Sequence, residues 1–363
     1  MTILIYSDPH LGLSLGAHTT VASRLRLQKK LEEHLLDKVL SQNRADMAIC
    51  AGDFFHKHQN TEELLSRAWP LAEMTSLILS GNHDVTNDAD KVGSLELLRR
   101  INPARIEDPW IVPVEFNQPY YESVWFGKGS NPCEICLVPH HSTQALFEQT
   151  LENILVDVPT GPRAVRLLVL HCNYNSPFVL EDGSLNLTRA KAGQLLNLFD
   201  KIVIGHDHNP KEDFGGRLVV LGNTHPTGFG DLSNKRIMLF DEATGSHSFE
   251  TIWEVAKGFQ EVRYNELAGV RPGVEFLQVT GEVGPEELHE VMQQLRKLWV
   301  SREDLFAVRS LVTVKTGDTM ANYAKTETLN VRELIEEELK PNEDLYALWK
   351  EILAEQHNGG ASA

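Results

Sequence analysis

The N-terminal part of the chain alternates between short apolar runs and amphipathic helical patterns, and this alternation restricts the fold more than any other feature. Three apolar runs, at residues 3–5, 47–50 and 77–79, have the length of buried strands. Between them, residues 25–36 and 61–73 place apolar side chains near helical spacing. A β-α-β-α-β order of this kind predicts a largely parallel sheet with helices on its faces.

The apolar runs continue farther along the chain. We expect four of them to continue the same sheet: residues 136–138, 166–170, 202–204 and 218–221. Residues 237–240 and 249–253 flank a turn at Glu242-Ala243-Thr244-Gly245, which predicts a hairpin. The fold class that follows is α/β.

The C-terminal third has a different pattern. Residues 265–273 are rich in turn formers, and a strand at 274–280, a helix after Pro285 and a strand at 305–315 follow them. We therefore predict three parts: 1–265 as the main domain, 270–322 as a small α+β domain, and 327–358 as two short amphipathic helices. Helices of about ten residues are marginal alone in water, so this last part must pack on the core or against another chain.

Composition and charge exclude several classes of protein. In a chain of 363 residues, 42% hydrophobic and 23% charged residues argue against wholesale disorder. No run approaches the roughly 18 apolar residues of a membrane span, and the N-terminus lacks the features of a signal peptide, so we expect a soluble, cytoplasmic protein. Four cysteines do not make a disulfide framework, and Cys133-x-x-Cys136 is interpreted as a strand end. The net charge of −17 argues against a broad basic face for nucleic acid, unless bound cations supply the attraction locally.

Clusters of Asp, Asn and His follow five of the predicted strands. They are Ser7-Asp8-Pro9-His10, Gly52-Asp53, Gly81-Asn82-His83-Asp84, His171 and Gly205-His206-Asp207-His208. Each alone is compatible with a turn, a helix cap or a core histidine. Because ligands bind outside the carboxyl ends of parallel strands, five such ends predict one shared site.

The residue types in these clusters predict a centre for two metal ions. Carboxylate and amide oxygens mixed with imidazoles, without a thiolate, suit Mn²⁺, Fe or Zn²⁺. Asp53 follows the second of the strands, and one carboxylate can bridge two ions roughly 3.5–4 Å apart. The glycines before Asp53, Asn82 and His206 are expected to allow tight turns.

Together these motifs resemble the complete motif set of the calcineurin-like metallophosphoesterases. Within that superfamily, Ser7-Asp8-Pro9-His10-Leu11-Gly12 and Gly52-Asp53-Phe54-Phe55-His56 are most similar to the SbcD-type DNA repair nucleases of bacteria and phages. The likeness in motifs covers residues 1–255. Beyond them, only the order of the predicted helices and strands is similar. The likeness implies two β-sheets flanked by helices, a small α+β cap domain and C-terminal helices. Val85-Thr86 and Gly222-Asn223-Thr224-His225-Pro226 depart from the family pattern.

The resemblance also implies a role for each matching residue. One metal ion would be held by Asp8, His10, Asp53 and His208, and the other by Asp53, Asn82, His171 and His206. His83 would be the acid near the leaving group, oriented by Asp84, and His56 would lie near the substrate. His140-His141 is a further pair at a strand end that could line the cleft.

The function implied is that of a DNA nuclease with two divalent ions, Mn²⁺ by resemblance, which cleaves phosphodiesters with a metal-activated hydroxide. The resemblance adds 3′→5′ exonuclease and endonuclease activity on duplex ends, a role in DNA repair and recombination, a homodimer, and an SbcC-like coiled-coil ATPase that docks on residues 327–358. The setting would be the cytoplasm of a bacterium or of a phage-infected host cell. One alternative is a phosphodiesterase or phosphatase for small molecules or phosphoproteins, which the net charge of −17 favours. Another is a non-catalytic scaffold, which the intact ligand set disfavours.

Overall fold

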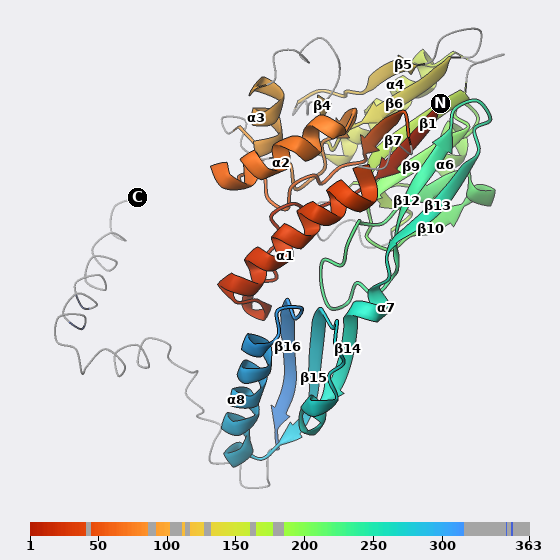
Figure 1. The fold of residues 1–363 in the computed structure, drawn as a ribbon. Coiled ribbons are helices and arrows are strands. Elements are labelled where there is room, and N and C mark those ends of the chain that lie inside the picture. The colour runs from red at the N-terminus through yellow and green to blue at the C-terminus, as the bar shows by residue number, and fades with distance from the viewer. Residues whose placement is uncertain are drawn as a thin grey trace. The chain divides into compact units, whose positions relative to one another are not determined.

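A computed structural model of the 363-residue chain gives the architecture (Figure 1). The residues it describes are 1–40, 45–85, 92–101, 111–112, 117–126, 132–159, 165–176, 185–315, 346 and 350. The predicted helical segment 327–358 lies outside the described residues, apart from positions 346 and 350. Val85 is described, whereas Thr86 is not.

The first sheet has six strands, in the order β13-β12-β1-β2-β3-β4. Its members are β1 (Thr2–Tyr6), β2 (Met47–Cys50), β3 (Leu77–Leu79), β4 (Ile111–Val112), β12 (Lys235–Asp241) and β13 (His247–Trp253). Strands β1 to β3 run parallel, as the β-α-β-α-β pattern predicted, and β4, which was not predicted, pairs parallel with β3. The predicted hairpin is confirmed as β12 and β13, which pair antiparallel at the edge.

The second sheet follows the order β10-β11-β9-β7-β6-β5, with β8 paired to β7. Its members are β5 (Glu122–Phe126), β6 (Cys133–Val138), β7 (Val165–Tyr174), β8 (Asn186–Leu187), β9 (Lys201–His206), β10 (Lys211–Asp213) and β11 (Leu218–Val220). The expectation that the later apolar runs continue the first sheet was therefore wrong. They form a separate sheet, in agreement with the two-sheet fold that the family resemblance implied. Cys133 and Cys136 are buried within β6.

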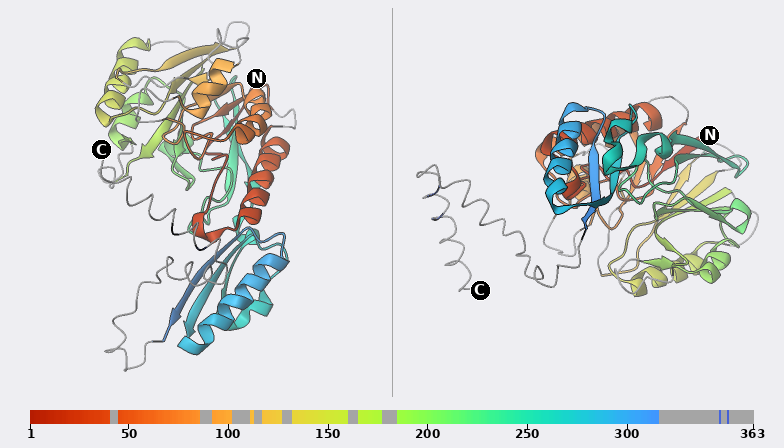
Figure 2. Two further views of the ribbon diagram at one scale, coloured as in Figure 1. Left: turned by 90° about the vertical axis from the view of Figure 1, so that its left-hand side faces the viewer. Right: turned by 90° about the horizontal axis from the view of Figure 1, so that it is seen from below.

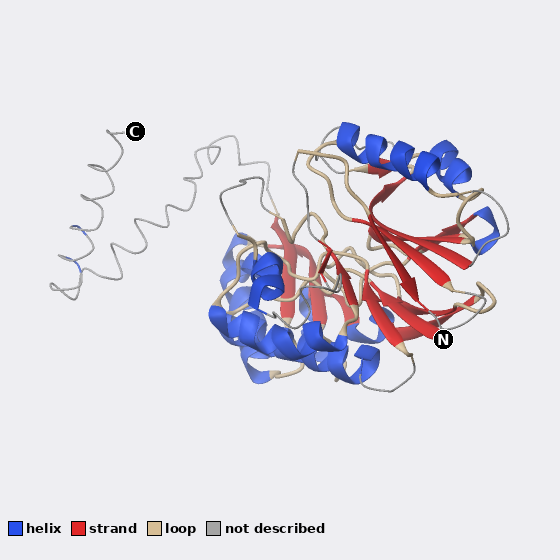
Figure 3. Ribbon diagram, turned by 90° about the horizontal axis from the view of Figure 1, so that it is seen from above, coloured by secondary structure: helices blue, strands red, loops and turns tan. Residues whose placement is uncertain are grey.

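The two sheets face each other, with helices outside each, as Figure 3 shows. Side chains that alternate along β1 divide between two cores: Ile3 and Ile5 contact residues of the second sheet such as Val169, whereas Leu4 and Tyr6 contact the helices. A third core lies on the outer side of the second sheet, where Phe147 belongs to the helical layer. Because the strands are covered on both faces, they carry continuous apolar runs rather than alternating ones.

Polar caps begin four of the α-helices in these outer layers. The helices of the layers are α1 (Val21–His34), α2 (Glu62–Met74), α3 (Ser94–Ile101), α4 (Gln144–Asp157) and α6 (Arg189–Leu195), and a π-helix at Leu35–Leu40 continues α1. The threonine side chain before α1, α2, α4 and α6 accepts a hydrogen bond from a backbone N–H of the first turn. Such caps satisfy donors that the helix itself leaves free, so the chain enters each helix at a defined residue.

The C-terminal described part contains a three-stranded sheet, in the order β14-β15-β16. It comprises α7 (Val255–Gly258), β14 (Phe259–Arg263), β15 (Phe276–Val283), α8 (Pro285–Ser301) and β16 (Ala307–Val314). In α8 the buried residues are Val291 and Leu295, and the helix lies along one face of this sheet (Figures 1 and 2). The predicted strand-helix-strand order is present, but β14 was not predicted.

By its contacts the chain divides into two compact units. One unit joins Met1–Gly281 with His289–Val312, and the second contributes, among the described residues, Glu282–Leu288, residues 313–315 and residues 346 and 350. The predicted boundaries of the domains stay a prediction. Within the described residues, no helix is long and apolar enough to cross a membrane.

The buried ion pair between Glu134 and Arg166 joins β6 to β7 and gives a test of the second sheet. Glu134 Oε2 accepts a hydrogen bond from Arg166 Nε at 2.6 Å, and the two side chains are 6% and 3% exposed. Glu134→Ala leaves the guanidinium buried without its partner, so the free energy of unfolding should fall by about 3–5 kcal/mol in urea titrations. Glu152→Ala removes an exposed partner of Lys191 and should cost less than about 1 kcal/mol. Equal losses in the two variants would contradict this account of the pair.

Candidate metal centre

The five predicted clusters lie at one edge of the paired sheets. Asp8 follows β1, Asp53 follows β2 and Asn82 follows β3, while His206 is the last residue of β9. His171 differs from the expectation, because β7 continues to Tyr174 and His171 lies inside the strand. It remains at the site because its register partner on β9 is Gly205, the residue before His206.

One group of ligand atoms gathers around Asp8, His10 and His208. The two Nε2 atoms of His10 and His208 are 3.1 Å apart, and Asp8 Oδ1 lies 3.9 Å from the first and 4.0 Å from the second. Asp53 Oδ2 lies 3.7 Å from His10 Nε2. These are the four residues that the family resemblance assigned to one ion.

A second group gathers around Asn82. Its Oδ1 lies 3.0 Å from His171 Nε2 and 2.9 Å from His206 Nδ1. Asp53 reaches this group with its other oxygen, since Oδ1 lies 3.4 Å from His171 Nε2. Asp53 therefore presents one carboxylate oxygen to each group, which is the arrangement that a bridging ligand requires.

These donors fit divalent cations. When metal–ligand distances are about 2.0–2.2 Å, neighbouring ligand atoms of one ion lie roughly 3–3.6 Å apart, close to the separations found here. Asp8 Oδ1 is fully buried and has no hydrogen-bond partner among the described residues, so it faces the first group with an unused lone pair. The side chains that would hold the ions are those that the resemblance implied: Asp8, His10, Asp53, Asn82, His171, His206 and His208.

Burial and mutual charge shift the pKa values of these groups in opposite directions. Burial raises the pKa of Asp8 and lowers that of His10 well below its ordinary value. For Asp53, burial acts upward, but the imidazoles of His171, His10 and His83 together outweigh it, so the pKa lies well below the ordinary value. For His171, burial acts downward, but Asp53, Asp8 and the hydrogen bond to the Ala51 carbonyl together outweigh it and raise the pKa to about 9. The carboxylate of Asp53 thus favours the protonated form of the neighbouring His171.

The backbone at the site is strained. Among the described residues, six other than glycine have a positive φ, and four of them are Asp8, His10, Asp53 and His206, at 52°, 41°, 49° and 94°. This conformation is uncommon for residues with a Cβ, and it persists where the surroundings over-determine it. Two bonds fix the first loops, from Asp8 N to the Gly52 carbonyl and from His10 N to the Asp53 carbonyl, both 3.1 Å long.

Glycine at position 81 begins a turn and is also required by the space around it. A Cβ there would meet Asp53 Oδ1 and the Asp53 backbone nitrogen, and it would lie 2.8 Å from His171 Nε2. Gly52, in contrast, has a φ of 109°, which is the expected tight turn. The expected turn is present, since the backbone nitrogen of Asp84 donates to the Gly81 carbonyl at 3.3 Å, and the missing Cβ of Gly81 also lets the third strand end pass close to Asp53.

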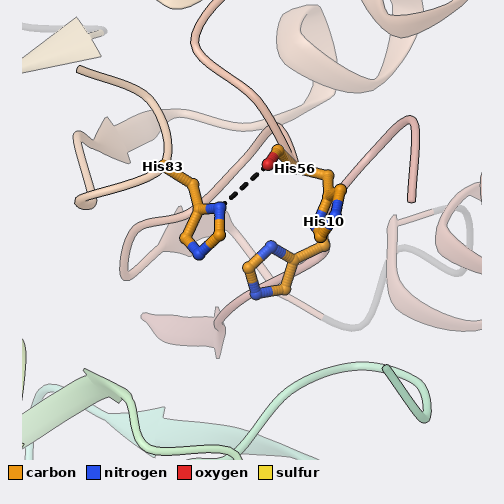
Figure 4. Close-up of side chains that lie close together, drawn as sticks. All are labelled: His10, His56 and His83. Atoms are coloured by element: carbon orange, nitrogen blue, oxygen red, sulfur yellow. Dashed lines mark hydrogen bonds between the residues drawn. The ribbon is translucent and has the colours of Figure 1, made fainter. Parts of the chain in front are cut away.

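Three imidazoles form a group beside the first set of ligands. Figure 4 shows His10, His56 and His83 gathered together, with ring centroids 4.9 Å apart for His10 and His83 and 5.5 Å apart for His56 and His83. The ring of His83 is fixed through Nδ1, which donates a hydrogen bond of 2.8 Å to the carbonyl of His56. Burial, with the positive charges of His83 and Lys57, lowers the pKa of His56 to about 4.

Asp84 does not orient His83 in this structure. Its two oxygens accept hydrogen bonds from the backbone N–H groups of Phe54, Phe55 and Gly81, at 2.8 to 3.0 Å. The predicted contact is absent because Asp84 turns into the protein, where it ties the loops after β2 and β3 together. Burial raises the pKa of Asp84 to about 7, and the charge of Asp53 acts in the same direction.

Two further groups contribute to the site. The carbonyl of Ala51 accepts a hydrogen bond of 2.9 Å from His171 Nδ1, which turns Nε2 toward Asn82. A pattern of side chains in the sequence could not reveal this partner, because it is a backbone atom. Burial lowers the pKa of His140 to about 3, with smaller influences from His171 and Asp53 nearby. His141 is a structural residue, since it is buried and bonded to Thr150 Oγ1 at 2.8 Å.

Comparison with known proteins places the chain in a family. Residues 1–210 match the family model described as calcineurin-like phosphoesterase, which is more than half of the chain. The chain belongs to the calcineurin-like phosphoesterases. Metal-dependent hydrolysis of phosphoesters is the chemistry of this family, and the two ligand groups are groups that could hold the metal ions it needs.

Solved structures similar to this phosphoesterase are distant. A Staphylococcus aureus protein proposed to be a 5′-nucleotidase is 13% identical over 69% of this chain and 52% of its own, with a TM-score of 0.38. This chain thus spans about half the length of that protein. A metallophosphoesterase from Sphaerobacter thermophilus is 14% identical over 69% and 88% of the two chains, with a TM-score of 0.30. No curated protein matches the sequence.

Gly81→Ala tests the close packing around Asp53 in this calcineurin-like phosphoesterase. The added Cβ would displace the Asp53 carboxylate or the His171 ring, so Mn²⁺ binding measured by calorimetry should weaken at least about tenfold. Gly228→Ala is the matched control, because its Cβ would have no neighbour within 4 Å and the φ of Gly228 is not in the positive range. Unchanged Mn²⁺ binding in Gly81→Ala would show that Asp53 is not fixed by this contact.

Proposed function

We propose that this phosphoesterase is a two-metal-dependent DNA nuclease. The observation that carries the proposal is the carboxylate of Asp53, which directs one oxygen to each of two groups of buried ligand atoms. Two divalent cations bound there would supply Lewis-acid stabilisation of phosphoryl oxygens and activation of water. The preference for DNA is supported by the resemblance of Ser7–Gly12 and Gly52–His56 to the SbcD-type nucleases.

The chain's own residues supply binding, orientation and a proton. The carbonyl of His56 fixes the His83 ring through Nδ1, which leaves Nε2 to deliver a proton to the departing 3′ oxygen. The His56 ring lies nearly parallel to that of His83, at an interplanar angle of 21°, and limits its rotation. In this proposal Asp84 acts only through the backbone that carries Asn82 and His83.

The surface beside His83 supports an extended anionic substrate. A hollow of about 450 Å³ is lined by His56, Lys57, His58, Gln59, Asn82, His83 and Val85. A second hollow of about 530 Å³ shares Lys57 and Gln59 with it and adds Arg24 and Arg67. A polynucleotide bound along these hollows would find Lys57 and Arg24 there for phosphate contacts, whereas Arg67 is paired with Glu32 and Glu63.

The second candidate function is hydrolysis of a small phosphodiester or phosphomonoester at the same site. The net charge of −17 favours it, since a small substrate needs no basic face beyond the metal ions. The two functions differ in how the substrate binds, and salt separates them.

The purified full-length chain with Mn²⁺ should degrade end-labelled duplex DNA faster than it hydrolyses a nucleotide or a phosphoprotein offered beside it. Its affinity for DNA should fall steeply with salt, because each phosphate contact adds a slope of about −0.9 to the dependence of log K on log salt. Gel analysis of the labelled strand would also report the polarity of digestion. Preference for the nucleotide or phosphoprotein, with salt-independent binding, would contradict the nuclease proposal and support the second candidate.

His83→Ala should abolish turnover while both ions stay bound. The reason is that His83 faces the substrate side, and general acid catalysis typically contributes about 10²–10⁴-fold. Asp53→Ala should instead release metal, as measured by metal analysis after gel filtration. His289→Ala, on the exposed face of α8, is the control and should retain both properties. A metal-free His83→Ala protein would show that His83 is a ligand rather than the acid.

The identity of the ion as Mn²⁺, the homodimer and the coiled-coil ATPase partner remain proposals that rest on the family resemblance. The docking segment assigned to residues 327–358 can be tested by deleting residues 327–363. Loss of co-purification with the ATPase, with Mn²⁺-dependent cleavage retained, would support the assignment, and continued binding would contradict it.

A further inference from the structure

His208 contacts a polar network that the sequence motifs do not contain. Its Nδ1 lies 2.8 Å from Thr227 Oγ1, on the side of the ring away from His10. Thr227 Oγ1 lies 3.3 Å from Asp231 Oδ2, and the backbone nitrogen of Thr227 donates to the same oxygen at 3.1 Å. Asn223 Nδ2 also donates to Asp231 Oδ2, at 2.6 Å.

The direction of these hydrogen bonds follows from the chemistry of the groups. A carboxylate only accepts, and Asp231 Oδ2 is in reach of the Thr227 hydroxyl, so in the relay this hydroxyl donates to Asp231 while its oxygen accepts from Asn223 Nδ2, at 3.4 Å, and from His208. Nδ1 of His208 then carries the proton, and Nε2 is left with a lone pair that points at Asp8 and His10. This is the tautomer that a metal-ligating imidazole with Nε2 as its ligand atom requires.

Asp231 is held in place by a buried lysine. Lys235, the first residue of β12, is fully buried, and its ammonium group contacts Asp231 Oδ1. The contact with this buried side chain anchors Asp231 to the first sheet, because a buried ammonium group needs an acceptor beside it. Asn223 belongs to the loop that departs from the family pattern, and its bond to Asp231 gives that departure a structural role.

We propose that Thr227 and Asp231 are positioning residues that fix the tautomer and orientation of His208 for metal binding through a carboxylate–hydroxyl–imidazole relay. The inference rests on the proposed metal site of the phosphoesterase. His171 has a comparable orienting partner in the Ala51 carbonyl, whereas Nδ1 of His10 has no hydrogen-bond partner among the described residues. The relay thus orients His208 in the group around Asp8, whereas the Ala51 carbonyl orients His171 in the group around Asn82.

The experiment compares Thr227→Val, Thr227→Ser and Thr224→Val in the full-length chain. Valine has nearly the shape of threonine and removes the hydroxyl, and serine restores it. Thr224 is the matched control, since it lies in the same loop and its hydroxyl contacts His225 instead of His208. The first readout is the ¹⁵N spectrum of histidine-labelled, metal-free protein, with the His208 signals assigned by His208→Gln. The second is Mn²⁺ titration by calorimetry.

In the unchanged chain, in Thr227→Ser and in Thr224→Val, His208 should carry its proton on Nδ1. In Thr227→Val that preference should be lost, and the affinity of one of the two Mn²⁺ ions should fall by about 10–100-fold while the other is unchanged. Asp231→Asn, which keeps the shape but weakens the acceptor, should give a smaller change in the same direction. Circular dichroism would confirm that each variant is folded.

If His208 keeps the Nδ1–H tautomer in folded Thr227→Val, or if Thr224→Val has the same effect, the relay is overturned. The nuclease proposal has a separate failure, because it falls if the unchanged chain binds two ions but prefers a substrate other than DNA. The tautomer of His208 is measured without metal and without substrate. A preference for a substrate other than DNA would therefore not contradict the relay.

Discussion

The buried carboxylate of Asp53 is the interaction on which the rest of this site depends. Only 1% of the side chain is exposed, and the backbone nitrogen of His83 donates to Oδ1 at 2.8 Å. A carboxylate removed from water in this way is stable only beside positive charge, which His171 supplies through its raised pKa. The left-handed backbone of Asp53, the missing side chain at Gly81 and the turn at Asn82 all serve to place that one group.

The packing of two sheets explains why residues far apart in the sequence meet here. Asp8, Asp53 and Asn82 come from the parallel strands of the first sheet, whereas His171 and His206 come from neighbouring strands of the second. The core between the sheets fixes their relative position, because interdigitated side chains allow little sliding. The relative position of ligands that come from two sheets therefore depends on how closely the apolar core between the sheets is packed.

The sequence predicted those parts of the fold and site that depend on local patterns. Apolar runs bounded by turn residues placed β2 and β3 at their observed ends, and the polar clusters after them identified the candidate ligands. The division into two sheets was not predictable from the runs, since strands buried on both faces look alike in either sheet. The close approach of Gly81 to Asp53 and the bonds from Asp84 to backbone N–H groups were not predictable for a similar reason, because both depend on tertiary packing. The Ala51 carbonyl and Thr227 are beyond such patterns, because one is a backbone atom and the other lies far along the chain from the nearest ligand motif.

The arrangement of lone pairs is itself an argument for bound cations. Nε2 of His10 and Nε2 of His208 face each other, and Asp8 Oδ1 and Asp53 Oδ2 face the same space. Acceptors that face one another at such distances repel unless a proton or a metal ion lies between them. Around Asn82, His171 can supply the proton, since Asp53 raises its pKa to about 9. Around Asp8, a neutral His10 can place its one proton between the two Nε2 atoms, but Asp8 Oδ1 is still left without a donor among the described residues. A divalent cation in each group would accept the lone pairs that face it. Because the cation displaces protons from its ligands, its binding would depend on pH.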